Sequence, residues 1–488
     1  MRLILLLHRY VGIVVGLVLA LWCLSGFVMM YQGYPRLLEV ERLQGLSSLQ
    51  LSGLHVPALD GDRPMSGFSI EMLNDRPVLK LQGLNSPTYD LASGAALSPL
   101  SQMAALDVAG DYAAAHGLPD ALQVLAPVTV DQWTLDGVRH RLPLWHLRVE
   151  DPASTELYIR GEDGQVVQVT TRRTRVLGYL GAVPHWLYPT VLRRNGALWD
   201  QVVIWTSLIG VFLTLTGLYV GIVRFRPLPS GRWSPYRRWH YWHHIVGLVF
   251  GLLTLTWVAS GLFTMNPWGF LDTEVGLTER VELSGGVTSA QIMQFLDHPP
   301  AVSPDVVELR AVPLAGQLYV AAIDRRGNVR RLNSGGTPAP LTEQELRAAL
   351  AKLDNRVAAL TLLTQPDDFY YSGYERKARF PVYRATLADA SGTTLYLDAT
   401  TGQLVDAADA TARQSRWLRT GLHDWDFTPA LRQRPVWDVV VLVLLAGVTV
   451  GCITGVWIAF RRVQHDLRRL WTRRRRRPSP VSSGRAGV

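Results

Sequence analysis

The chain is poor in cysteine and lacks the glycine-rich sequences that bind nucleotides. Its 488 residues include only Cys23 and Cys452, and both lie inside apolar runs. Two such cysteines exclude a disulfide framework, a CxxC zinc site and a covalent CxxCH haem site. No GxGxxG, GxxxxGKS or GxxxxGKT sequence occurs. We therefore expect no nicotinamide or nucleotide site of its own in this chain.

Charge is missing from four long apolar segments. Residues 10–30, 202–223, 245–265 and 439–460 contain no charged side chain, and about 20 such residues cross a bilayer core of about 30 Å as a helix. The first segment has no clear small-residue cleavage site, which favours an uncleaved anchor over a signal peptide. Hydrophobic residues make up 48% and charged residues 18% of the chain. These values fit membrane spans combined with water-soluble domains.

Positive charge is concentrated in the short loop between the second and third apolar segments and in the tail after the fourth. Residues 224–239 contain five arginines and no acidic residue, and the tail from Arg461 onward contains ten arginines. The positive-inside rule places both regions, and the N-terminus, in the cytoplasm. We expect the arginine-rich tail to set topology and to attract anionic lipid, and we expect no nucleic-acid partner. We then expect the two long stretches between the apolar segments, roughly 34–197 and 269–434, on the periplasmic side of a bacterial inner membrane.

The two halves of the chain repeat each other. HRYVGIVVGLVLALWCLSGFVMM, which starts at His8, aligns with HHIVGLVFGLLTLTWVASGLFTM, which starts at His243. The offset is 235 at that point and becomes 238 further along, where His185 aligns with His423. Each half therefore consists of a helix, a soluble domain and a second helix.

Local patterns predict mixed α/β structure in the soluble parts. Residues 123–130 and 143–149 are rich in strand-forming side chains. LYIRGEDGQVVQV and LYLDATTGQLVDA each predict two strands joined by a turn, at Gly164 and at Gly402. A helix is predicted near Leu341, with Thr342 and Glu345 as its capping box.

The predicted fold class is an α+β membrane protein, a four-helix transmembrane bundle built by internal duplication. Each repeat contributes two helices and one periplasmic α/β domain. The predicted segments are helix 1 (1–33), domain 1 (34–197), helix 2 (198–224), the cytoplasmic loop (225–239), helix 3 (240–268), domain 2 (269–434), helix 4 (435–462) and the basic tail (463–488).

Two histidine pairs occupy equivalent positions in the repeats. His8 and His243 each lie four residues before a glycine at the cytoplasmic start of a helix, and His185 and His423 each lie 14 residues before the Trp–Asp that opens the next helix. Neutral imidazole is a good iron ligand, and two axial ligands complete the coordination of haem iron. We predict one haem between His8 and His243 and a second between His185 and His423. Two such haems would form an electron path across the membrane.

Two points stay open. His240 and His244 are alternatives to His243, because HYWHH offers three imidazoles. The GxxxG spacing in these helices leaves room for a cofactor but is also typical of ordinary helix packing. The other histidines have no counterpart in the opposite repeat and are interpreted as surface or packing residues: His55, His116, His140, His146, His298 and His465.

HRYVGIVVGLVLALWCLSGF, GAVPHWLYP and TGLHDWDF resemble the PepSY-associated transmembrane family over nearly the whole chain. The arrangement of helices, soluble domains and paired histidines is also similar to that of the di-haem ferric-siderophore reductases of bacterial inner membranes. That resemblance implies PepSY-like periplasmic domains, two non-covalent b-type haems and reduction of Fe(III) on the periplasmic side. The ligand positions that it implies are His8, His185, His243 and His423.

Three functions are compared. The first is electron transfer from a cytoplasmic or quinol donor to a ferric siderophore. The alternative is a non-enzymatic PepSY protein that regulates a protease or serves as an accessory binding module. A transporter built from parallel repeats ranks last, because no apolar segment is interrupted by charge.

No catalytic residue is assigned, and one aromatic cluster is weighed as a substrate site. In one interpretation the cluster receives an anionic or aromatic chelate. In the other, which we favour because Tyr371 aligns with Trp133, the cluster is a packing patch beside a basic turn. The cluster consists of Phe369, Tyr370, Tyr371 and Tyr374, next to Arg376, Lys377 and Arg379.

Overall fold

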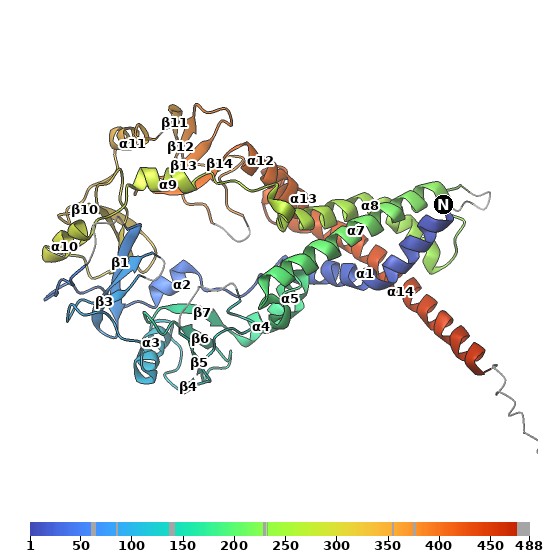
Figure 1. Cartoon of the computed structure of the whole chain (residues 1–488), viewed down its shortest axis with the longest axis horizontal. Coiled ribbons are helices and arrows are strands. Elements are labelled where there is room, and N and C mark those ends of the chain that lie inside the picture. Colours follow the sequence, from blue (N-terminus) through green and yellow to red (C-terminus); the bar gives the residue numbers. More distant parts are fainter. Residues whose placement is uncertain are drawn as a thin grey trace, which may run out of the picture.

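The computed structural model has a helical bundle at one end and β-sheets at the other (Figure 1). It describes residues 1–59, 65–83, 86–135, 142–227, 231, 233–353, 356–373 and 377–475. Four of its helices are long and apolar enough to cross a membrane. The predicted multi-pass α+β membrane protein is therefore confirmed.

The membrane-spanning helices are α1 (Arg2–Met29), α7 (Gly196–Arg224), α8 (Trp239–Thr264) and α14 (Val436–Arg475). α1 and α8 each contact both α7 and α14, so the first helices of the two repeats face each other across the bundle. All backbone groups inside each helix bond internally, as a bilayer requires. α14 continues beyond the others at the end that carries the N-terminus (Figure 1).

The two cysteines meet inside this bundle. Cys23 Sγ on α1 lies 3.8 Å from Cys452 Sγ on α14, and both thiols are free. Small residues bring the same helices close, since a Cβ on Gly26 would lie 3.4 Å from Leu445. The contact joins the first helix of one repeat to the last helix of the other.

Three antiparallel sheets form the opposite end. One has six strands in the order β10-β9-β8-β1-β2-β3, and the others have the orders β4-β5-β6-β7 and β11-β12-β13-β14. The strands of the six-stranded sheet are β1 (Gly67–Leu73), β2 (Arg76–Gln82), β3 (Thr88–Asp90), β8 (Val306–Ala311), β9 (Tyr319–Asp324) and β10 (Val329–Asn333). The other strands are β4 (Leu122–Val124), β5 (Trp145–Val149), β6 (Glu156–Ile159), β7 (Val166–Thr170), β11 (Val357–Leu363), β12 (Val382–Leu387), β13 (Thr394–Asp398) and β14 (Leu404–Ala408).

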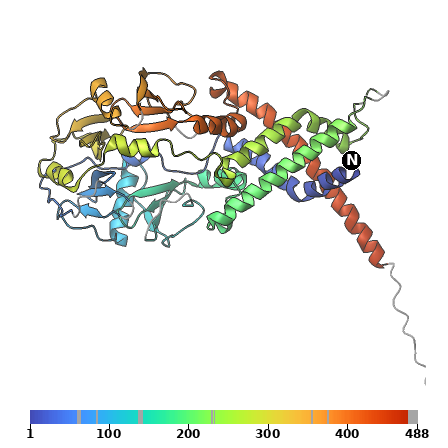
Figure 2. The ribbon, with the colours of Figure 1, turned by 45° about the horizontal axis from the view of Figure 1, so that its top comes forward.

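The six-stranded sheet is shared between the repeats. β1 of the first repeat pairs with β8 of the second, with Glu71 directly opposite Glu308. Its core also mixes the repeats, because Phe68 packs on Phe295 at a centroid distance of 5.7 Å. The domain boundaries at 34–197 and 269–434 stay a prediction, but the two stretches are tied together by main-chain hydrogen bonds. Figure 2 shows the two repeats side by side along the length of the molecule.

Short helices cover the sheets and connect them to the bundle. α3 packs on β4, β5 and β6, and α5 and α13 contact α1 and α8 respectively. The short helices are α2 (Glu39–Gln44), α3 (Gln102–Ala115), α4 (Arg172–Leu180), α5 (Ala182–His185), α6 (Thr190–Arg193), α9 (Leu277–Ser284), α10 (Ser289–Asp297), α11 (Glu343–Leu350), α12 (Ala410–Arg416) and α13 (Leu422–Asp424). A π-helical turn at Trp417–Gly421 joins α12 to α13, and 3₁₀ turns lie at Pro267–Gly269 and Ala430–Arg432.

The predicted hairpins are confirmed, but one strand is shorter than predicted. Gly164 and Gly402 have φ of +70° and +78° in the turns before β7 and β14, a conformation that glycine adopts without strain. Residues 123–130 form a strand only up to Val124, followed by an isolated bridge from Val128 to Leu144. Pro127 lies in this stretch and has no N–H for a sheet hydrogen bond.

Half of the predicted capping box is present on α11. Thr342 accepts a hydrogen bond from the Glu345 backbone N–H at 3.2 Å. The Glu345 carboxylate is instead 2.5 Å from Arg331 Nη2. A charge-assisted bond to a buried guanidinium is stronger than one to a neutral backbone N–H, so the carboxylate is drawn away from the cap.

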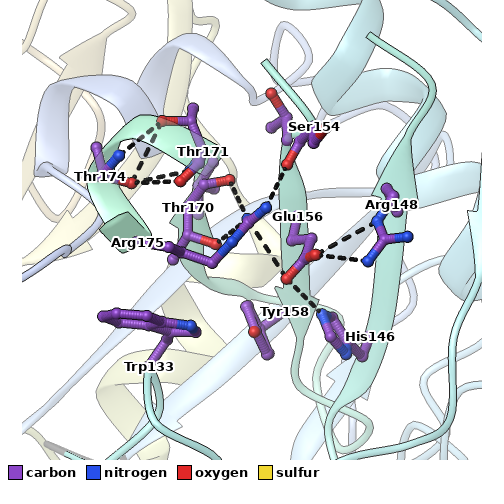
Figure 3. Close-up of polar contacts among 12 residues, drawn as sticks. Trp133, His146, Arg148, Ser154, Glu156, Tyr158, Thr170, Thr171, Thr174 and Arg175 are labelled. Carbon is purple, nitrogen blue, oxygen red and sulfur yellow. Dashed lines mark hydrogen bonds and ion pairs between the residues drawn. The ribbon is translucent and has the colours of Figure 1, made fainter. Parts of the chain in front are cut away.

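Glu156 on β6 is a buried acid held by three basic side chains (Figure 3). His146 Nε2 and Arg148 Nη2 lie 3.2 and 2.9 Å from its carboxylate oxygens, and Arg175 Nη1 lies 3.4 Å away. Burial raises the pKa of Glu156, but the bonds from His146 and Arg148 and the charge of Arg175 outweigh it and lower the pKa to about 2. His146 also stacks on Tyr158, which is a packing role as predicted.

We expect Glu156 to make stability depend on pH in the acid range. Its folded pKa of about 2 lies below the ordinary 4.5, so its contribution is present above pH 4.5 and is lost as the pH falls toward 2. Glu156→Gln should therefore cost roughly 3 kcal/mol at pH 7 and little at pH 2. Unfolding followed by tryptophan fluorescence at several pH values tests this, with the exposed Glu150→Gln as control. Equal losses at pH 7 and pH 2 would contradict it.

Candidate functional site

The first histidine pair lies at the end of the bundle that carries the N-terminus. His8 on α1 and His243 on α8 face each other with ring centroids 6.4 Å apart and planes at 32°. A Cβ at Gly217 would lie 2.7 Å from His8 Cε1, and a Cβ at Gly455 would lie 2.9 Å from His243 Cε1. Only glycine at these places on α7 and α14 leaves room for the rings.

Each ring of this inner pair is oriented by the neighbouring helix of its own repeat. His8 Nδ1 lies 3.1 Å from the Leu213 carbonyl and 3.4 Å from Thr216 Oγ1. His243 Nδ1 lies 3.1 Å from the Gly451 carbonyl and 3.3 Å from Thr454 Oγ1. A carbonyl only accepts hydrogen bonds, so Nδ1 carries the proton in both rings.

The second pair lies where the bundle meets the sheets. His185 at the end of α5 and His423 in α13 have ring centroids 6.1 Å apart, with planes at 69°. His185 Nδ1 is 3.1 Å from the Trp22 carbonyl, and His423 Nδ1 is 3.0 Å from Ser260 Oγ. The Ser260 hydroxyl donates to the Trp257 carbonyl at 2.9 Å, so its oxygen accepts the His423 Nδ1–H.

All four rings thus have the same arrangement. Each donates from Nδ1, and Nε2 makes no hydrogen bond to any described residue. Metal-bound histidines are oriented in this way, with one nitrogen donating and the other ligating. Two metal–nitrogen bonds of about 2 Å each, plus the ring radii, put imidazole centroids about 6 Å apart across one ion. Both observed separations match that spacing.

The outer pair is kept in the neutral form that a metal requires. Burial and the neighbouring His423 ring lower the pKa of His185 to about 4. Burial also lowers the pKa of His423, although its Trp257 backbone partner opposes this. Neutral imidazole has a free lone pair at neutral pH.

The alternatives to His243 are placed differently. His244 is buried with Nδ1 2.7 Å from Ser234 Oγ and Nε2 2.8 Å from the Gly221 carbonyl, so neither nitrogen is free for a metal. His240 is exposed. Ligation by His243 stays a prediction, but of the three imidazoles only His243 faces the ring at the equivalent position of the opposite repeat.

Space is present beside the inner pair. Gly247, one turn after His243, has no heavy atom within 4 Å of the point where a Cβ would lie, and Gly16 has only Val456 at 3.9 Å. Gly12 and Gly251 are closer to their neighbours, since a Cβ there would lie 3.6 Å from Leu213 and 2.6 Å from Leu218. Open space against the helix backbone is therefore found at one glycine after each histidine of the inner pair.

The aromatic cluster packs, as the favoured interpretation predicts. Tyr370 is buried and stacks on Tyr396 at 5.2 Å, and its hydroxyl donates to the Arg379 carbonyl at 3.1 Å. Tyr371 donates to Asp426. Tyr374 and Arg376 lie outside the described residues, as does His140, and Lys377 and Arg379 are exposed.

A charged cleft of about 640 Å³ lies beside the shared sheet. Sequence patterns did not reveal it, because its walls come from both repeats. Most of its charges are already paired: Arg42 with Glu71, Lys80 with Glu71, and Arg160 with Asp163 at 2.8 Å. We therefore interpret the charged side chains of the cleft as an ion cluster that stabilises the fold.

Comparison with protein families gives a match to the family described as PepSY-associated TM region over residues 5–304. That is more than half of the 488 residues. The chain belongs to the PepSY-associated TM family. The PepSY-associated match includes His8, His185 and His243 and ends before His423, so it is shorter than the nearly full-length resemblance predicted. A search among curated proteins finds no match to this PepSY-associated chain.

Proposed function

We propose that this protein transfers electrons across the bacterial inner membrane to an Fe(III) chelate, most naturally a ferric siderophore, in the periplasm. Two b-type haems would be held, one by His8 and His243 and one by His185 and His423. The observation that carries the proposal is the repeated histidine arrangement, four rings fixed through Nδ1 with Nε2 unengaged. Ligating histidines donate from one ring nitrogen to an outer partner and keep the other nitrogen for the metal.

The donor set favours haem over a bare metal ion. No group of three or more His, Cys, Asp or Glu side chains in the described part of the chain is arranged to hold a metal. Two imidazoles alone make a weak site, whereas a porphyrin supplies four further ligands to the iron. When bound, a bis-histidine haem gains and loses single electrons and has no open position for oxygen chemistry.

The chain's own residues would orient the histidine rings and keep water away from the haems. The carbonyls of Leu213, Gly451 and Trp22 fix the ring tautomers, and the surrounding apolar helices exclude water. The two pairs lie at opposite ends of the bundle, which spaces them along the path through the bilayer. Under this proposal the inner pair lies at the cytoplasmic face, which the arginine-rich loop and tail support through the positive-inside rule.

Two kinds of electron donor are consistent with reduction of Fe(III) by single electrons. Each Fe(III) chelate takes one electron, so a quinol that releases two electrons and two protons reduces two chelates. Reduction weakens the hold of hard oxygen ligands on the iron and so frees it. A cytoplasmic one-electron carrier is the other donor consistent with the absence of nucleotide-binding sequences.

The test begins with protein expressed with ample haem and purified in detergent. We expect two b-type haems per chain in the dithionite-reduced minus oxidised spectrum. In proteoliposomes, chemically reduced protein should be reoxidised by an external Fe(III) chelate, with one Fe(II) trapped per electron. A folded preparation without haem would reject the proposal and favour an anchored PepSY binding module.

A further inference from the structure

The segment that carries His423 differs from its counterpart at two positions. Arg416 and Arg419 stand where the first repeat has Gly178 and Gly181, at the offset of 238. In the first repeat, the Trp133 ring fills the space over Gly178, because a Cβ there would lie 2.8 Å from Trp133 Cζ3. The second repeat keeps an aromatic ring there, because Tyr371 aligns with Trp133 and its ring centroid lies 5.5 Å from Arg416 Cζ. It therefore adds two cations to the segment that carries His423.

The nitrogens of these cations are not fully paired. The Arg416 side chain is only 9% exposed, and Nη2 lies 3.2 Å from Asp426 Oδ1. Arg416 Nε and Nη1 and Arg419 Nε are buried and make no hydrogen bond within the described residues. Burial lowers the pKa of Arg419, and only Asp272 opposes this. Buried donors without partners are costly, so the positions indicate a missing acceptor.

The chemistry of the donors identifies the acceptor. Guanidinium groups bind carboxylates through paired, charge-assisted hydrogen bonds. Arg419 lies four residues before His423 in a continuous helical segment, which brings both side chains to one face. Trp22 Nε1, in the residue whose carbonyl holds His185, is also buried and unpaired among the described residues. The unpaired donors thus belong to the helical segment that carries His423 and to the residue that holds His185.

We propose that Arg416 and Arg419 form a carboxylate site that holds the propionate groups of the haem assigned to His185 and His423. The inference rests on the proposed function. A carboxylate on an external ferric chelate has the same chemistry and is the other source. The propionate is favoured because three of the donor nitrogens are buried and because both arginines belong to the segment that carries His423.

The test measures redox potentials of wild type and Arg419→Gln, with the exposed Arg379→Gln as the matched charge control. Arg419→Gln should raise the oxidised-to-reduced ratio of the outer haem about tenfold at fixed potential, which is about 59 mV for one electron. The inner haem should not change. Arg416→Gln should also lower the potential of the outer haem. Arg416→Lys keeps the positive charge that faces Asp426, so its shift in potential should be smaller than that of Arg416→Gln, and it controls for misfolding of that variant.

Reconstitution with haem dimethyl ester separates the sources. If Arg419 acts through a propionate, the shift should fall by at least half when the propionates are esterified. An undiminished shift, or no shift in haem-replete protein, would overturn the inference while the proposed function stands. An altered KM for carboxylate chelates with unchanged potentials would assign the site to substrate and also overturn it. Wild-type protein without haem would overturn both proposals.

Discussion

Replacing any one of the four histidines with alanine should remove one haem and leave the other. His8→Ala and His243→Ala should lose the inner haem, and His185→Ala and His423→Ala the outer haem. In the proposed sites each ring would be one of only two protein ligands, so alanine would leave the haem held by a single histidine. Haem per chain should therefore fall from two to one, as measured by pyridine haemochrome and by the loss of one step in a redox titration.

Double variants test how the histidines are paired. His8→Ala with His243→Ala should still retain one haem, because both changes affect the same site. His8→Ala with His185→Ala should retain none. The separations of 6.4 and 6.1 Å join rings of different repeats. Loss of only one haem in the His8 and His185 double variant would show that each haem is held within one repeat instead.

Neighbouring histidines provide the control. His244→Ala removes bonds to Ser234 and Gly221 and should retain both haems. His240→Ala changes an exposed residue of the same helix and should do the same. Thr216→Val removes a partner of His8 Nδ1 together with the hydroxyl's own bonds to the Phe212 and Leu213 carbonyls. We expect inner-haem affinity to fall about 10-fold, at the lower end of outer-shell effects.

The parts of the fold that depend on local pattern were predictable. Unbroken apolar runs define the four spanning helices, and Gly164 and Gly402 mark turns that need positive φ. The pairing of β1 with β8 was not predictable, because it joins Ile70 to Leu309 across about half of the chain. Register over such a distance depends on tertiary packing, which single-sequence patterns do not contain.

The same limit applies to the site. Duplication singled out the histidines, but the choice between His243 and His244 depends on which acceptors lie near each ring. Gly451 and Thr454 on α14 position His243, and their proximity is a property of the bundle. The proposed arginine site was not predicted, although the alignment contained its signal, since Arg416 and Arg419 stand opposite glycines. Differences between the repeats carry information that their similarities do not.

Removing the Arg42 guanidinium should destabilise the shared sheet more than any other single change of charge that we consider. Glu71 and Glu308 are directly opposite each other on β1 and β8, and each is at most 5% exposed. Arg42 bonds both, with Nη1 3.0 Å from Glu71 Oε2. Like charges opposite each other repel, and breaking a buried ion pair costs about 3–5 kcal/mol. Arg42→Met should show a loss of that size.

The measurement is unfolding of the sheet region, followed by hydrogen exchange of the β1 and β8 amides. Arg76→Gln is the matched control, because Arg76 is 67% exposed in its pair with Asp90 and should cost about 0–1 kcal/mol. Lys80 and Arg310 still hold Glu71 and Glu308 in Arg42→Met, but the two carboxylates then repel each other without a guanidinium between them. Adding Glu71→Gln and Glu308→Gln removes that repulsion and should recover part of the loss. If Arg42→Met costs no more than Arg76→Gln, the ion cluster does not stabilise the junction. If the loss occurs without recovery, packing by the Arg42 side chain, rather than its charge, joins the repeats.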